Sequence, residues 1–236
     1  MSASLSPAVV LPVYNEGATV GRVLDAVREV FSGLLIVVDD GSEDATAGVL
    51  EARSDTRVLS HERNRGYGRS LIEGFSAALE AGCGAVVTMD CDGQHEPLHI
   101  PEFLVALGDE CDIASGSRYL PDSPVVGTAP PERQAVNDAV TREINRVTGW
   151  SLTDAFCGFK AYRARALRNM RLTEDGYALP LQVWAEAHRA GLCVVELPVA
   201  RIYFDGDRSF GRDLDDPEKR LAYYLRVWND ALEKEA

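Results

Sequence analysis

Near the middle of the chain, in GAVVTMDCDGQH, an apolar segment runs directly into two carboxylates one residue apart, Asp90 and Asp92. Residues i and i+2 of an extended segment point the same way, so both carboxylates can face one point. Two close negative charges repel each other unless a proton or a cation lies between them. Oxygen ligands of this kind suit Mg²⁺ or Mn²⁺, whose coordination is usually completed by water and substrate phosphates. The pair therefore predicts a divalent cation that holds a diphosphate.

Four other clusters of polar residues follow apolar segments in the same way. They are PVYNE (12–16), DDGSEDAT (39–46), NRGYG (64–68) and GSR (116–118). One such cluster is commonly a turn with a helix cap. In open α/β sheets, ligands bind outside the carboxyl ends of the strands, so five clusters at such ends indicate one large polar site. The adjacent Asp39 and Asp40 suit either a turn or hydrogen bonds with a base or a ribose.

The elements that must position these clusters alternate between strands and helices. Apolar runs predict strands at residues 8–13, 34–40, 56–61, 84–90 and 112–118. Helical periodicity predicts helices at residues 17–31, 42–52, 69–82 and 101–108. Continuous apolar strands separated by helices predict an α/β fold, with a mixed, mostly parallel sheet and helices on both faces.

From about residue 121 the pattern is more variable. A loop rich in Pro and Gly at 122–132 precedes predicted helices at 133–147 and 179–191, a strand at 193–204, a polar loop at 205–216 and a helix at 217–236. We expect a single domain over residues 1–236, with a nucleotide-binding type of half at about 1–120 and a more variable half at about 121–236.

The last predicted helix carries an apolar stripe, formed by Leu221, Tyr224, Leu225, Trp228 and Leu232. We expect this stripe to dock on the core or on a second copy of the chain. The other interpretation is a helix that lies in a membrane interface. The negative charge of the chain weakens that interpretation, because the cytoplasmic leaflet is itself negative.

Composition narrows the classes of function. The 236-residue chain is 46% hydrophobic and 26% charged, and its formal net charge of −13 argues against a nucleic-acid partner. No apolar run approaches the ~18 residues of a membrane span, and MSASLSPAVV lacks a basic leader. We therefore expect a cytoplasmic protein with at most peripheral contact at the inner face of the membrane. Neither G-x-G-x-x-G nor G-x-x-x-x-G-K-[ST] occurs, which disfavours a Rossmann cofactor site and a P-loop.

The polar clusters, taken together, resemble a known family. PVYNE, VVDDGSEDAT, NRGYG, the D-x-D of MDCDGQH and GSR come in the order and spacing of glycosyltransferase family 2. DAFCGFK (154–160) is similar to the D-x-x-x-G-F-[RK] element of the dolichyl-phosphate mannosyltransferase and polyprenyl-phosphate glycosyltransferase branch. The resemblance covers about residues 8–210, and the ordered set is far more specific than any one motif.

The resemblance implies a GT-A fold, which is Rossmann-like, and an inverting transfer from a nucleotide-diphosphate sugar with Mg²⁺ or Mn²⁺. It implies nucleotide-sugar contacts by Pro12, Tyr14, Glu16, Asp39, Asp40, Asn64, Gly68 and Gln94. It implies a metal held by Asp90, Asp92 and Gln94, and phosphates held by Arg118, Arg133, Lys160 and Arg208. Of these residues, Asp90, Asp92 and Arg118 would be catalytic.

One segment departs from the family pattern. The mannosyltransferases carry D-R-x-Y-G-x-S-K, where this chain has DRSFGRDLDD (207–216). Arg208 and Gly211 match, whereas the Ser-Lys pair, which in the family helps to grip a lipid phosphate, becomes Asp213 and Leu214. Because DAFCGFK and Arg133 do match, a polyprenyl or dolichyl phosphate stays the first prediction for the acceptor.

Other interpretations stay open. A hydroxyl acceptor would need a base, and Asp154 is the first candidate, although a structural cap suits it equally. A sugar-nucleotide-binding module without activity is a second class of function. A nucleotidyltransferase is disfavoured, because PVYNEGATV offers no cation after the first strand. GDP-mannose, UDP-glucose and UDP-GlcNAc-type donors all fit the sequence.

Overall fold

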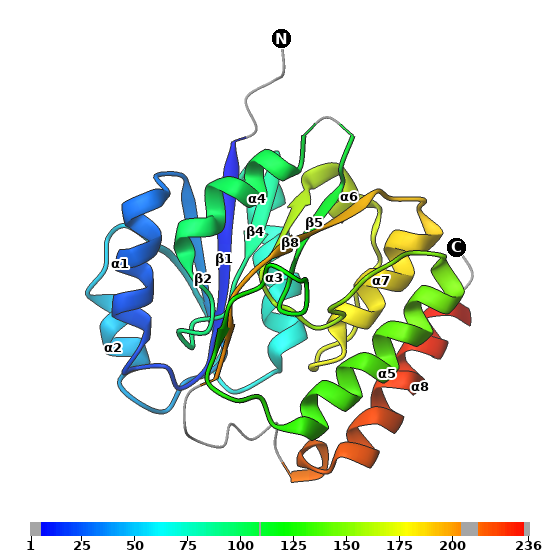
Figure 1. The fold of residues 1–236 in the computed structure, drawn as a ribbon. Coiled ribbons are helices and arrows are strands. Elements are labelled where there is room, and N and C mark those ends of the chain that lie inside the picture. The colour runs from blue at the N-terminus through cyan, green and yellow to red at the C-terminus, as the bar shows by residue number, and fades with distance from the viewer. Residues whose placement is uncertain (1–5, 109, 204–211, 234–236) are drawn as a thin grey trace.

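The computed structural model describes residues 6–108, 110–203 and 212–233, and its centre is a seven-stranded sheet (Figure 1). The strand order is β3-β2-β1-β4-β7-β5-β8. Their bounds are β1 Pro7–Val13, β2 Leu34–Asp39, β3 Arg57–Ser60, β4 Ala85–Thr88, β5 Ile113–Ser117, β7 Lys160–Arg163 and β8 Val194–Pro198. Only β7 runs antiparallel to its neighbours, so the other six carboxyl ends meet at one edge.

Helices cover both faces of the sheet, as predicted. They are α1 Val20–Val30, α2 Thr46–Glu51, α3 Tyr67–Glu80, α4 Ile100–Ala106, α5 Pro131–Thr148, α6 Ala164–Asn169, α7 Leu179–Arg189 and α8 Pro217–Glu233. Two 3₁₀ turns, η1 Pro97–His99 and η2 Arg212–Asp215, precede α4 and α8.

The alternation of side chains along the strands explains the two layers of core. On β1, Val10 packs in the cluster that contains residues of α3, α5, α7 and α8. Its neighbours Val9 and Leu11 pack in the opposite cluster, with residues of α1 and α4. Because successive side chains of a strand point to opposite faces, an unbroken apolar run is what a strand covered on both faces requires.

The second half departs from the predicted elements in three places. The strand β7 and the helix α6 were not predicted, and β7 inserts between β4 and β5. The strand predicted at 193–204 is divided, because after Pro198 the chain leaves the main sheet. Its continuation, β9 (Arg201–Ile202), pairs with β6 (Val125–Val126), which lies inside the segment predicted to be a loop.

The C-terminal helix packs within the chain. Tyr224 and Trp228 of α8 are buried, and Leu221, Leu225 and Leu232 pack against the same core cluster. The helix lies beside α5 and α7 (Figure 1). The apolar stripe therefore docks on the core, and the predicted contact with a second subunit stays a prediction.

Candidate active site

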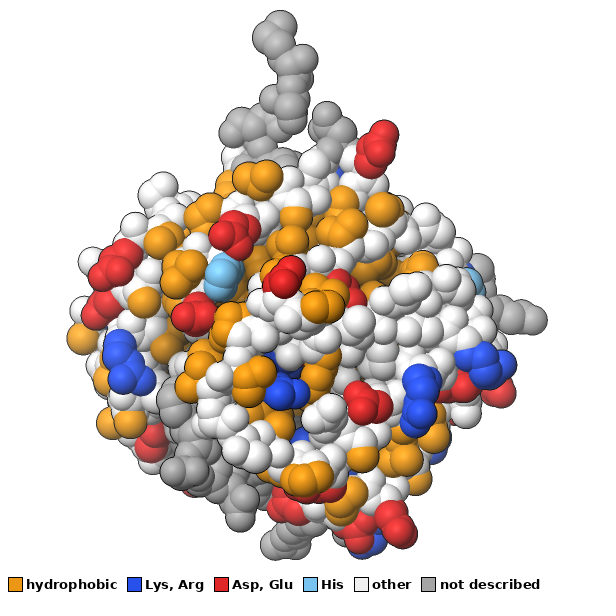
Figure 2. All heavy atoms as spheres, viewed as in Figure 1, with side chains coloured by type: hydrophobic (Ala, Val, Ile, Leu, Met, Phe, Trp, Pro, Cys, Tyr) orange, Lys and Arg blue, Asp and Glu red, His pale blue; other side chains and the backbone are white. Residues whose placement is uncertain are grey.

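A cavity of about 450 Å³ opens at the carboxyl edge of the sheet. The residues that line it come from the end of β1, from the segments after β1, β4 and β5, from α3, α5, α7 and α8, and from the loops that carry Phe156, Tyr177 and Tyr203. Eight of the predicted site residues line it, namely Pro12, Tyr14, Glu16, Asp90, Asp92, Gln94, Arg118 and Arg133. On the face of the molecule seen in Figure 2, acidic groups are spread over the surface and basic atoms are visible in a recess near the centre.

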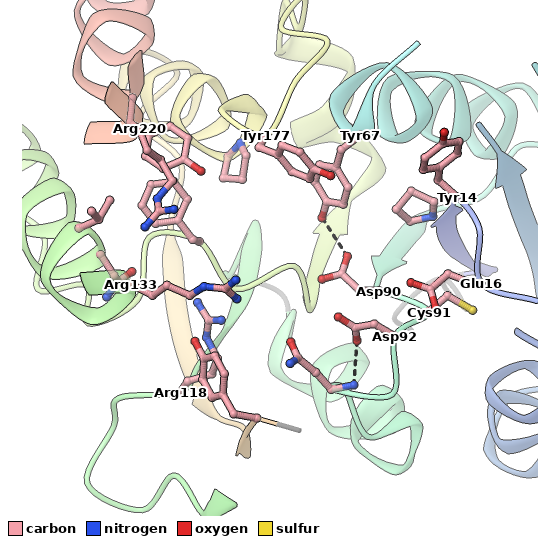
Figure 3. A pocket seen from close by; sticks show the side chains of 18 of the residues that line it. Tyr14, Glu16, Tyr67, Asp90, Cys91, Asp92, Arg118, Arg133, Tyr177 and Arg220 are labelled. Atoms are coloured by element: carbon pink, nitrogen blue, oxygen red, sulfur yellow. Dashed lines mark hydrogen bonds between the residues drawn. The ribbon is translucent and has the colours of Figure 1, made fainter. Parts of the chain in front are cut away.

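Asp90 and Asp92 lie on one wall of the cavity, just beyond the end of β4 (Figure 3). The hydroxyl of Tyr67 donates to Asp90 Oδ1 at 3.1 Å. Burial and the Asp90 carboxylate raise the pKa of Tyr67 well above its ordinary value, so the hydroxyl keeps its proton and remains a donor. The backbone N–H of Gln94 donates to Asp92 Oδ1 at 2.8 Å, which closes the turn after the strand.

His95 supports the same turn from inside the protein. The backbone N–H of Asp90 donates to His95 Nδ1 at 2.9 Å. The other ring nitrogen faces the buried Cys157 Sγ at 4.0 Å. The imidazole therefore holds the backbone beneath the two carboxylates and leaves their side chains directed at the cavity.

Arg118 and Arg133 extend into the cavity from the opposite side (Figure 3). Arg118 follows β5 and forms a two-pronged ion pair with Asp154, with Nε–Oδ2 at 2.7 Å and Nη2–Oδ1 at 3.0 Å. Arg133 lies in the first turn of α5. The cavity thus has an acidic wall and a basic wall.

Asp154 is fully buried and does not line the cavity. Besides Arg118, it accepts hydrogen bonds from the backbone N–H groups of Phe156 and Cys157, at 3.1 and 3.2 Å. Although burial disfavours both charges, each ion-pair partner stabilises the other, so the pKa of Asp154 lies below and that of Arg118 above its ordinary value. Asp154 positions Arg118 and is poorly placed to take a proton from a substrate.

Glu196 of β8 holds this turn in place and was missed by the sequence analysis. Its carboxylate accepts from the backbone N–H and hydroxyl of Thr153, both at 2.8 Å, and from the backbone N–H of Asp154 at 3.0 Å. An acid in the middle of the apolar segment VVELPV was the available signal.

The carboxylates of Asp39 and Asp40 do not line the cavity. Asp40 is buried and accepts from the backbone N–H groups of Arg65 and Gly66, both at 2.8 Å, and its Oδ1 lies 2.6 Å from His61 Nδ1. Asp39 accepts from the backbone N–H of Ser42 at 3.0 Å. Both acids hold loops at the edge of the sheet, and their contact with a nucleoside stays a prediction.

Three further predicted residues, Asn64, Gly68 and Lys160, do not line the cavity. Asn64 is exposed, and Gly68 packs so closely that an added Cβ would lie 2.2 Å from the Glu174 carbonyl oxygen. Lys160 is buried, donates to the Cys157 carbonyl and lies 5.1 Å from the centre of the Trp184 ring. Burial lowers the pKa of Lys160, and its contact with a phosphate stays a prediction. Arg208 lies outside the described residues.

Aromatic residues that were not predicted complete the cavity. Tyr67 stacks on Tyr177 with ring centres 5.7 Å apart, and Phe156 packs on Tyr224 at 4.6 Å. Tyr67 was within reach of the sequence, because it belongs to the NRGYG cluster. The others had no signal, because they come from helices and turns far along the chain.

Two properties of the described part of the chain bear on metals and membranes. No set of three or more His, Cys, Asp or Glu side chains there is arranged to hold a metal ion. Two carboxylates are nevertheless enough for a hard cation whose other ligands are water and substrate phosphates. None of the helices described combines the length and the apolar character that a membrane crossing needs.

Comparisons with known proteins bear on the family of the chain. The model of the family described as Glycosyl transferase family 2 matches residues 8–171. The chain is 33% identical over 201 residues to undecaprenyl-phosphate mannosyltransferase of Micrococcus luteus, an alignment that covers 80% of this chain and 81% of the relative. It is 32% identical over 204 residues to polyprenol monophosphomannose synthase of Mycolicibacterium smegmatis, covering 81% of this chain and 75% of that protein.

A solved structure supports the fold. Glucosyl-3-phosphoglycerate synthase from Mycobacterium tuberculosis, in complex with Mn²⁺, UDP and glucosyl-3-phosphoglycerate, superposes with a TM-score of 0.74 and 21% identity. The match covers 99% of this chain and 82% of that chain. The predicted GT-A architecture is thereby confirmed.

Proposed function

The chain belongs to glycosyltransferase family 2, and we propose that it transfers a hexose from a nucleotide-diphosphate sugar to a polyprenyl phosphate. The family makes the protein a glycosyltransferase, while donor, acceptor and metal are parts of the proposal. The two relatives above carry the names of a mannosyltransferase and a phosphomannose synthase, so GDP-mannose is the first donor to test. Contact with a membrane would then be peripheral, through the acceptor.

The observation that carries the proposal is the opposition of charge across the cavity. Asp90 and Asp92 on one wall face Arg118 and Arg133 on the other (Figure 3). A diphosphate between these walls can bind the guanidinium groups directly, since one guanidinium donates two hydrogen bonds to phosphate oxygens. It can meet the carboxylates only through a cation.

The two carboxylates suit a Mg²⁺ or Mn²⁺ ion. Both are oxygen ligands at the rim of a cavity large enough for a nucleotide sugar, and the turn through Gln94 and His95 keeps them in place. Asp90 and Asp92 would hold the ion, with Gln94 beside them. Such an ion supplies charge neutralisation of the leaving diphosphate, worth several kcal/mol of the barrier.

The proposed chemical step is the inverting transfer that the family resemblance implies. An oxygen of the acceptor phosphate forms a bond with the anomeric carbon on the face opposite the diphosphate. The bond from that carbon to the diphosphate oxygen breaks, and its electron pair leaves with the nucleoside diphosphate. The configuration at the anomeric carbon is thereby inverted.

An acceptor phosphate agrees with the environment of Asp154. A phosphate is ionised at neutral pH and needs no general base, whereas a hydroxyl acceptor must lose a proton. Asp154 was the first candidate for that base, and it is buried, paired with Arg118 and absent from the cavity wall. The arrangement supports a reaction in which the acceptor arrives already charged.

Labelled-sugar transfer tests the proposal. The purified protein is incubated with radiolabelled GDP-mannose or UDP-glucose, Mn²⁺ or Mg²⁺, and either undecaprenyl phosphate or undecaprenol. We expect an organic-extractable product that is labile to mild acid, formed only with the phosphate and lost in excess EDTA. Transfer to undecaprenol or to a soluble hydroxyl compound alone would overturn the acceptor. Donor binding with no transfer to any acceptor would identify a binding module instead.

A further inference from the structure

The loop at residues 173–177 is fastened to the C-terminal helix by one carboxylate. Glu174 Oε1 accepts from the hydroxyl of Tyr223 on α8 at 2.5 Å and from the backbone N–H of Gly176 at 2.9 Å. Burial and the bond to Glu174 raise the pKa of Tyr223 well above its ordinary value, so the hydroxyl keeps its proton and remains a donor. Neither side chain lines the cavity, and neither belongs to a motif named above.

A second side chain holds the beginning of the same loop. Gln182 of α7 is buried, and its Oε1 accepts from the backbone N–H groups of Thr173 and Glu174, at 2.7 and 2.9 Å. Its Nε2 donates to Thr173 Oγ1 at 3.0 Å. The backbone of the loop is therefore tied to two helices, α7 and α8, by side chains whose polar groups are used for this purpose.

Two glycines let the loop lie directly against the start of α3. A Cβ added at Gly66 would lie 2.3 Å from the carbonyl oxygen of Asp175, and one added at Gly68 would lie 2.2 Å from that of Glu174. Gly66 also has a φ of 109°, which disfavours any residue with a Cβ. Because these glycines flank Tyr67 in the chain, the loop contacts the helix on both sides of that residue.

The loop supplies a cap that α3 lacks in its own sequence. The residue before the helix is Gly66, which has no side chain to accept from the first N–H groups. The carbonyl oxygen of Asp175 instead accepts from the backbone N–H of Arg69 at 3.1 Å, and Asp175 Oδ1 pairs with Arg69 Nη2 at 2.7 Å. The position of the first turn of α3 thus depends on the loop.

Tyr67 connects this first turn to the proposed metal site. It is the first residue of α3, its ring stacks on that of Tyr177 in the loop, and its hydroxyl donates to Asp90 Oδ1 (Figure 3). A partner that fixes the orientation of a metal-binding carboxylate supports the affinity for the ion, and removing such a partner typically costs about 10- to 100-fold. A displaced loop would therefore weaken metal binding.

We propose that Glu174 is a positioning residue for the cation at Asp90. Bonded to Tyr223, it holds the loop at 173–177 against the start of α3, and the loop keeps the hydroxyl of Tyr67 on the Asp90 carboxylate. The inference rests on the proposed function, because it assigns Glu174 a role toward the divalent cation proposed there. It also connects the docking of α8 with the opposite wall of the cavity.

Binding of Mn²⁺ tests the assignment without turnover. The ion is titrated into each variant in the presence of GDP and, separately, of UDP, and free Mn²⁺ is measured by electron paramagnetic resonance. Glu174→Ala removes the acceptor of both bonds and should weaken Mn²⁺ binding by about 10-fold. Tyr223→Phe removes one donor and should weaken it by about 3-fold. Glu174→Gln keeps an oxygen that accepts from both donors, so it should bind Mn²⁺ as wild type does.

A double-variant cycle separates positioning from stability. If Glu174 acts through the hydroxyl of Tyr67, then Glu174→Ala should weaken Mn²⁺ binding no further in a Tyr67→Phe background, where that hydroxyl is already absent. Its effect on thermal unfolding should persist in both backgrounds. If Glu174→Ala does not fold, Tyr223→Phe takes its place in the cycle.

A variant at the opposite edge of the sheet controls for a general loss of stability. Arg28 Nη1 donates to the carbonyl oxygen of Gly33, just before β2, at 2.8 Å. Arg28→Gln should therefore unfold at a lower temperature than wild type and yet bind Mn²⁺ with the wild-type affinity.

The possible failures are distinguishable. If folded Glu174→Ala and Tyr223→Phe bind Mn²⁺ as wild type does, or if Glu174→Ala weakens binding equally in the Tyr67→Phe background, the assignment of Glu174 is wrong and the proposed function stands. If wild type binds no Mn²⁺ with either nucleotide, the metal site and the role of Glu174 are both refuted. If Mn²⁺ binding depends on Glu174 but sugar is transferred only to hydroxyl compounds, the proposed acceptor is wrong and the assignment stands.

Discussion

Replacing Asp154 by asparagine should lower the stability of the fold far more than it lowers the rate of the chemical step. The side chain is fully buried and carries both prongs of the ion pair with Arg118. Removing one partner of a buried pair leaves an uncompensated charge and typically costs about 3–5 kcal/mol. For a chain of this size each kcal/mol shifts the unfolding midpoint by about 2–4 °C, so Asp154→Asn should lower it by about 6–20 °C.

Thermal unfolding at pH 7 measures this shift, and an exposed ion pair provides the control. Glu143 and Arg146 pair at 2.6 Å on the outer side of α5, so Glu143→Gln should leave the midpoint within about 1–2 °C. The double variant Asp154→Asn/Arg118→Gln should lose less than the sum of the single variants, because it no longer strands a charge.

The pH dependence of stability gives a second readout with a defined sign. The folded pKa of Asp154 is lower than its ordinary value, so the pair contributes its full stability above the unfolded pKa of about 3.9. That contribution is lost as the pH falls from there through the lower folded pKa. The difference in unfolding free energy between wild type and Asp154→Asn should therefore shrink in acid.

Two results would refute this reasoning. One is an Asp154→Asn variant whose midpoint matches that of wild type at pH 7. The other is a wild-type rate profile with an acidic limb that Asp154→Asn removes while the fold stays intact, which is the signature of a general base. The second result would also favour a hydroxyl acceptor over a phosphate.

Three other substitutions test the site and its supports. Asp92→Asn should keep the fold but abolish most turnover and metal-dependent nucleotide binding. If the turnover of this variant, measured while Mn²⁺ is titrated, reaches that of wild type, the metal site is contradicted. Tyr67→Phe removes the 3.1 Å donor to Asp90, worth about 1 kcal/mol, so kcat/KM should fall several-fold while the unfolding midpoint falls by at most about 2–4 °C, and an unchanged kcat/KM would exclude this role. Asp40→Ala removes the acceptor of the Arg65 and Gly66 backbone N–H groups and should lower the free energy of unfolding by about 1 kcal/mol in urea. Calorimetry of the folded fraction then decides whether Asp40 also contacts a nucleoside.

The elements that the sequence predicted well are those defined by local pattern. The strands β1, β2 and β4 are unbroken apolar runs, and α3 has a clear helical period. Since parallel strands end at a common edge, the polar residues that follow them could be assigned to one site before any contact was known. Asp90, Asp92 and Arg118 were found in this way.

What the sequence did not predict depends on contacts between distant residues. The four residues of β7 become a strand only because β4 and β5 leave a place between them. The partner of Asp154 is 36 residues away, and the buried position of Arg220 depends on how α8 docks beside α5. Local periodicity carries no information about such pairings, whose stability comes from tertiary packing.

The chain has many acidic residues near the edge of the sheet, and they differ in the groups that their carboxylate oxygens contact. Asp39 and Asp40 turn their carboxylates to backbone N–H groups, and Asp154 turns its carboxylate to a guanidinium. Those oxygens are already used in holding loops and an arginine in place. Asp90 and Asp92 also accept hydrogen bonds, from the Tyr67 hydroxyl and the Gln94 N–H, but they line a cavity whose other wall is basic (Figure 3). Because a carboxylate whose oxygens are all used by the fold has little left to offer a cation, we expect a cation at Asp90 and Asp92 and not at Asp39, Asp40 or Asp154.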